Sequence, residues 1–100
     1  MAIVVEDGTG LNPAANSYVS EAELTTYATD RGITLVGSAD HLLLMSMDTL
    51  ETRKYQGDKT STSQPLQWPR TGVVVDGSSI GSDEIPSDLK TAQIITALSI

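Results

Sequence analysis

The sequence predicts a mainly α-helical domain, a small bundle of three helices with a long loop, a short β-hairpin and an extended N-terminal arm. Three observations carry this prediction. Apolar residues recur at helical spacing in three segments, and capping residues precede two of them. A polar stretch without this periodicity separates the second segment from the third. An Asp-Gly pair follows a β-branched run, which is typical of a tight hairpin. With 100 residues, we expect a single domain, 1–100.

Residues 1–19 are predicted to form the arm. Ile3, Val4 and Val5 are a short β-branched run, and a turn rich in glycine follows it. So short a run is not stable as an isolated strand, so we expect it to lie on this domain or on a neighbouring subunit. These three residues are therefore candidates for a subunit interface.

The first helix is predicted at about residues 20–31. Ser20 and Glu23 have the spacing of a capping box, in which each side chain caps the backbone N–H of the other residue. Leu24 begins its apolar face. Gly32 is suited to the position just after a helix end.

The second helix is predicted at about residues 38–55. Ser38 is placed to cap its N-terminus, and no glycine or proline interrupts the segment that follows. Apolar residues surround more than half of its circumference, so we expect it to be central and packed on several sides or against another subunit. Leu43 and Met47 are its candidates for that interface.

Residues 56–85 are predicted to form the loop and hairpin. The first part is polar, and loops of this length are usually functional or disordered. Val73 to Val75 are β-formers, and Asp76-Gly77 after them predicts the hairpin turn. The second strand of the hairpin has a weak signal.

The third helix is predicted at about residues 86–100. Proline is favoured at the first helical position, where Pro86 stands. Leu89, Ala92 and Ile95 mark its apolar face, and the pattern runs to Ile100 without a capping signal. We therefore expect that this sequence ends inside a longer natural helix or protein.

Trp68 and Arg70 flank a proline in the loop and stand out among few aromatic and basic residues. A tryptophan ring needs a pocket, and an arginine can pair with acids or stack. One interpretation is that Trp68 anchors the loop on the helical core. Another is that it docks onto a neighbouring subunit, which makes both residues interface candidates. Stacking of a DNA base on Trp68 is less favoured, because the other aromatic residues do not align with it.

No set of residues converges on a catalytic, cofactor or metal site. The chain has no cysteine and a single histidine, His41, whose place in a first helical turn indicates a solvated side chain. We therefore expect that the protein is not an enzyme and binds no cofactor. A net charge of −7 opposes non-specific binding to nucleic acid or anionic membranes. Neither a signal peptide nor an apolar run of ~20 residues is present, so we expect a protein made in the cytoplasm, with no membrane contact.

Three segments together resemble a known family. Val5 to Gly10, Ala15 to Ser20 and Trp68 to Gly72 read VEDGTG, ANSYVS and WPRTG in this order. They resemble a family of tailed-phage proteins often labelled DnaT-like single-stranded DNA-binding proteins, which look like head-to-tail adaptors. The resemblance implies a virion protein of the neck, assembled in the host cytoplasm as a ring of about twelve copies. Its partners would be other copies of itself, the portal protein and a tail or stopper protein, with DNA only passing through.

The resemblance therefore leads us to expect a structural head-to-tail connector subunit. The alternative is a replication accessory protein that binds single-stranded DNA. The net charge of −7 suits the wall of a DNA conduit better than a DNA binder, which favours the first function at this stage.

Overall fold

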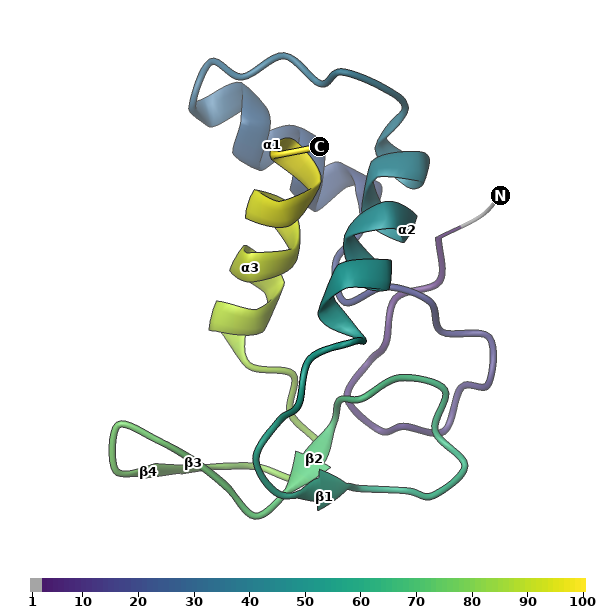
Figure 1. The fold of residues 1–100 in the computed structure, drawn as a ribbon, viewed down its shortest axis with the longest axis vertical. Coiled ribbons are helices and arrows are strands. Elements are labelled where there is room, and N and C mark those ends of the chain that lie inside the picture. Colours follow the sequence, from purple (N-terminus) through teal and green to yellow (C-terminus); the bar gives the residue numbers. More distant parts are fainter. Residues whose placement is uncertain (1–2) are drawn as a thin grey trace.

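The computed structural model describes residues 3–100, which form three helices and two short antiparallel strand pairs (Figure 1). In Figure 1 the helices lie above the strand pairs. The fold is mixed, so the predicted mainly α class is right only for the helical part. In chain order the elements are α1 (Glu21–Asp30), α2 (Ala39–Leu50), β1 (Asp58–Lys59), β2 (Arg70–Thr71), β3 (Val73–Val75), β4 (Ser78–Ile80) and α3 (Ser87–Leu98).

The core has two parts. α2 and α3 run side by side, and α1 packs against both at the upper end in Figure 1. The upper cluster of buried side chains joins the three helices and consists of Val19, Leu24, Leu42, Leu43, Ile94 and Ala97. The lower cluster joins α2 and α3 to the loops and consists of Ala15, Tyr18, Met47, Leu50, Leu66, Trp68, Val73 and Leu89.

The start of α1 is as predicted. The Ser20 hydroxyl accepts a hydrogen bond of 3.1 Å from the Glu23 N–H, and the Glu23 carboxylate accepts one of 3.0 Å from the Ser20 N–H. Gly32 follows the helix with a φ of 65°, as the position after a helix end requires.

α2 is shorter than predicted, because it ends at Leu50 and not near residue 55. The Tyr55 hydroxyl donates a 2.9 Å hydrogen bond to the Leu50 carbonyl, so the chain folds back at this point. Arg53 and Lys54 therefore lie beyond the helix and not in its last turn. α3 also differs slightly at its start, since Pro86 is the capping residue before Ser87 and not the first helical residue.

The predicted hairpin is present and consists of β3 and β4. Val73 pairs with Ile80, and the two turn residues Asp76 and Gly77 have φ angles of 51° and 80°. Positive φ at both positions matches the twist of a tight hairpin turn. The second strand pair, β1 with β2, was not predicted.

The N-terminal segment lies on its own domain, one of the two places expected for it. Val5 forms a parallel bridge with Ser17, and the Glu6 N–H donates a 2.8 Å hydrogen bond to the Ser17 carbonyl. The predicted arm also includes residues 1–2, which lie outside the described residues. Within residues 3–100, no helix is both long and apolar enough to cross a membrane.

Candidate functional site

The turn after Val5 is organised by a buried carboxylate. Oε2 of Glu6 accepts hydrogen bonds of 2.9 Å from the N–H groups of both Gly8 and Gly10. Gly8 has a φ of 101°, and a Cβ atom there would collide with the carbonyl oxygen of Asp83. These residues of the VEDGTG segment thus hold the N-terminal turn against the loop before α3, which is a structural role.

A second buried polar group joins three distant segments. The Gln93 side chain accepts a 2.9 Å hydrogen bond from the Tyr18 N–H and donates one of 2.8 Å to the Ser17 hydroxyl. It also donates to the Leu43 carbonyl at 3.4 Å. Gln93 is fully buried on α3, and no periodic pattern in the sequence identified it.

Trp68 is buried beside Tyr18 and not exposed on the loop. The residue is 5% exposed, and its backbone N–H donates a 3.2 Å hydrogen bond to the Tyr18 hydroxyl. Its indole Nε1 has no hydrogen-bond partner among residues 3–100. The peptide bond between Trp68 and Pro69 is cis. Trp68 therefore anchors the long loop on the lower core.

Arg70 is also turned inward. Its guanidinium donates hydrogen bonds of 2.8 Å and 2.7 Å to the carbonyls of Gln56 and Gly57, and one of 3.0 Å to the Gln67 side chain. Backbone oxygens thus surround a side chain that is only 8% exposed. Arg70 holds the two ends of the loop together.

The other predicted interface residues lie mainly inside the chain. Leu43 is fully buried and Met47 is 5% exposed, both on α2. Ile3, Val4 and Val5 are partly buried, and Ile3 packs against the upper cluster. Their contact with a second subunit, like that of Trp68 and Arg70, stays a prediction.

A hollow of about 450 Å³, which we call the Tyr55 groove, lies between the segment after α2, β3 and the start of α3. Its walls are mostly apolar, and the Tyr55 and Trp68 rings meet edge to face there with centroids 5.5 Å apart. The lining residues are Lys54, Tyr55, Gln56, Trp68, Val73, Val74, Val75, Pro86, Asp88 and Leu89. A flat apolar group of the size of a nucleobase fits the chemistry of these walls.

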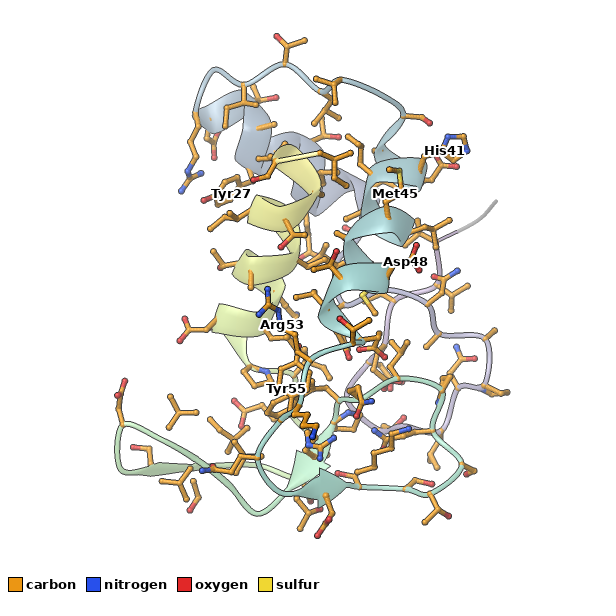
Figure 2. The ribbon with its side chains drawn as sticks, viewed as in Figure 1. Tyr27, His41, Met45, Asp48, Arg53 and Tyr55 are labelled. Carbon is orange, nitrogen blue, oxygen red and sulfur yellow. The ribbon has the colours of Figure 1, made fainter. Side chains whose placement is uncertain are left out.

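Two basic residues, Arg53 and Lys54, directly precede Tyr55 in the sequence. Lys54 lines the groove, Arg53 precedes it, and Lys90 belongs to the first turn of α3. Figure 2 shows Arg53 and Tyr55 close to the lower ends of α2 and α3. Asp88 lines the opposite wall and offsets one of these charges. One of the six basic residues of the chain, Lys54, thus lines this hollow, and Arg53 is its neighbour in the sequence.

The Tyr55 side chain is neutral at physiological pH. Burial raises the pKa of its hydroxyl above the ordinary value of 10.0, and the negative charge of Glu51 adds to the effect. The hydroxyl keeps its proton to donate to the Leu50 carbonyl, which orients the ring at the groove. Among residues 3–100, no group of three or more His, Cys, Asp or Glu side chains could hold a metal ion.

A family model described as "Putative DnaT-like ssDNA binding protein" matches residues 1–100. No curated protein and no solved structure matches the chain. The connector function that we expected from the sequence is wrong, because the matching family is described by single-stranded DNA binding, the alternative function. The match does not confirm an identity as a phage head-to-tail adaptor.

Proposed function

We propose that this chain, which belongs to the family of DnaT-like single-stranded DNA-binding proteins, binds single-stranded DNA through the Tyr55 groove. The observation that carries the proposal is the family match over the whole sequence. The groove supports it by supplying a place for a base beside positive charge.

Proteins that bind single-stranded DNA without strong sequence preference combine aromatic side chains, on which bases stack, with basic residues along the backbone path. The Tyr55 ring is partly exposed, and the buried Trp68 ring meets it edge to face from the core. Val74 and Val75, which are 50% and 40% exposed, extend the apolar wall. A base entering the groove would lie against Tyr55 and these valines.

Positive charge around the groove is modest. Arg53 and Lys54 are exposed, and Lys90 is partly exposed. Lys54, which lines the groove, can meet a phosphate beside a base held at Tyr55. The net charge of −7 works against them at long range, so we expect weak binding that requires low salt.

Fluorescence anisotropy of a labelled oligothymidine, titrated with the protein at low salt, tests the proposal. Tyr55→Ala should weaken binding about 5- to 150-fold, the range for loss of one stacked base. Tyr55→Phe should bind much more strongly than Tyr55→Ala, since it keeps the ring and loses only the hydrogen bond to Leu50 that orients it. Circular dichroism of each variant checks that the fold is retained.

Tyr27→Ala is the matched control. Tyr27 is partly exposed under the Arg31 guanidinium at the opposite end of the helices, far from the groove (Figure 2). This variant should bind DNA normally. If it loses as much affinity as Tyr55→Ala, the site lies elsewhere, and if the wild type binds no DNA at low salt, the proposed function fails.

A further inference from the structure

A second hollow, which we call the α2 hollow, lies on the outer side of α2, where α2 meets the N-terminal segment and the long loop. It measures about 530 Å³ and shares no lining residue with the Tyr55 groove. Ten residues line it, namely Ala15, Asn16, Leu44, Met45, Met47, Asp48, Glu51, Thr52, Pro65 and Leu66. Two sites on separate surfaces can be occupied at the same time.

The floor of the α2 hollow is apolar and adaptable. Met45 is 48% exposed, although it belongs to a helix whose other long apolar side chains are buried or partly buried. Leu44 and Pro65 extend the apolar surface on either side of it. Methionine has a flexible, polarisable side chain, which suits contact with an apolar group of a partner. An apolar side chain of another molecule could therefore pack against Met45.

The rim of the α2 hollow is negative. Asp48 is exposed, and Figure 2 shows it below Met45 and His41 along the outer side of α2. Glu51 adds a second carboxylate, fixed in place by hydrogen bonds from the Tyr18 hydroxyl and the Gln67 N–H. None of the ten lining residues is Lys, Arg or His. This combination repels phosphate and attracts a basic ligand.

We propose that the α2 hollow binds a partner protein through a segment in which an apolar side chain is flanked by lysine or arginine. Charge complementarity identifies this occupant: two carboxylates, Asp48 and Glu51, line the hollow together with apolar side chains, and no lysine, arginine or histidine lines it. The negative charges of Asp48 and Glu51 repel the phosphates of DNA. The α2 hollow also shares no lining residue with the Tyr55 groove, so this binding does not depend on the groove. A protein bound there would stand on a different face from the proposed DNA path.

The test uses two synthetic amphipathic peptides of about 12 residues, close to α2 in length. One peptide has leucine at every third or fourth position, so that the leucines share one helix face, and lysine at the positions between them. The other peptide has glutamate in place of every lysine. Each carries a fluorophore, and anisotropy at low salt measures its binding to the full chain. The wild-type protein should bind the lysine peptide and not the glutamate peptide.

Asp48→Lys should weaken binding of the lysine peptide at least about fivefold, because it places a like charge at the rim. Met45→Gln should weaken it as well by removing the apolar floor. Asp30→Lys is the matched control, since it makes the same change of charge at an exposed position that lines a different hollow. It should have less than about half the effect of Asp48→Lys on the dissociation constant.

Three outcomes would overturn the inference. Equal loss in Asp48→Lys and Asp30→Lys would show attraction to the acidic chain as a whole. Binding of the glutamate peptide, or of neither peptide, would exclude recognition of a basic segment. Light scattering that shows a wild-type dimer and an Asp48→Lys monomer would make a second copy of the chain the occupant. Because the oligonucleotide titration is separate, loss of peptide binding and loss of DNA binding are distinguishable.

Discussion

The hydroxyl of Tyr18 donates a 2.7 Å hydrogen bond to Oε2 of Glu51, which lies 33 residues further along the chain. The same hydroxyl accepts the N–H of Trp68, and Oε1 of Glu51 accepts the N–H of Gln67. One tyrosine thus joins the segment before α1 to the end of α2 and to the long loop. Trp68 of this junction lines the Tyr55 groove, and Glu51 lines the α2 hollow.

Tyr18→Phe should destabilise the fold by about 1–3 kcal/mol, because it leaves the Glu51 carboxylate and the Trp68 N–H without this partner. Urea unfolding measures the change. Tyr27→Phe is the control and should change the free energy of unfolding by less than about 0.5 kcal/mol, as for most surface substitutions. Equal effects of the two variants would show that the junction contributes little to stability.

Gly8→Ala and Gly32→Ala separate backbone strain from a steric collision. Both positions have positive φ, at 101° and 65°, but only at Gly8 does an added Cβ meet another atom, the Asp83 carbonyl. We expect Gly32→Ala to cost about 1 kcal/mol, as for an alanine in the left-handed region, and Gly8→Ala to cost clearly more. Thermal unfolding of both variants measures this. A smaller loss for Gly8→Ala would contradict the close contact with the loop before α3.

Stability should fall at alkaline pH because of Tyr18 and Tyr55. Burial is the largest cause that raises the pKa of each hydroxyl above the ordinary 10.0, and the charge of Glu51 comes second. Above pH 10 the unfolded chain therefore holds fewer of these protons than the folded chain, so the free energy of unfolding decreases as pH rises. It is unaffected by these groups well below pH 10. Denaturant unfolding between pH 8 and pH 11 should show a shallower decline in Tyr18→Phe, and an identical decline would contradict the assignment.

The salt dependence of the DNA association constant should report how many basic side chains contact phosphates. If Arg53, Lys54 and Lys90 all take part, the logarithm of the DNA association constant should fall with the logarithm of salt with a slope of about −2. Lys54→Ala should make the slope shallower by about 0.7. Lys59→Ala is the control, because Lys59 is exposed in β1 and does not line the groove. A slope that responds to Lys59 and not to Lys54 would place the DNA elsewhere.

The net charge of the chain does not describe where its charges lie in the folded structure. The net charge of −7 favoured a DNA conduit over a DNA binder at the level of the sequence. A net charge gives no information on where the individual charges lie. In the folded chain, Lys54 lines one hollow with Arg53 beside it in the sequence, and Asp48 and Glu51 line another. A ligand would meet this local arrangement of charge, which the net charge of the sequence does not contain.

The sequence by itself determined the features that depend on neighbouring residues. The Ser20–Glu23 box starts α1, and Asp76-Gly77 turns the hairpin, because capping and positive φ are properties of a few adjacent residues. Tertiary structure alone decided where α2 ends, that β1 pairs with β2, and that Tyr18 and Gln93 are buried hydrogen-bonding centres. The hydrogen bond from Gln93 to Ser17 spans 76 residues. Such contacts form only when the helices pack. Packing also creates the two hollows, so the residues that line each hollow share no local sequence pattern.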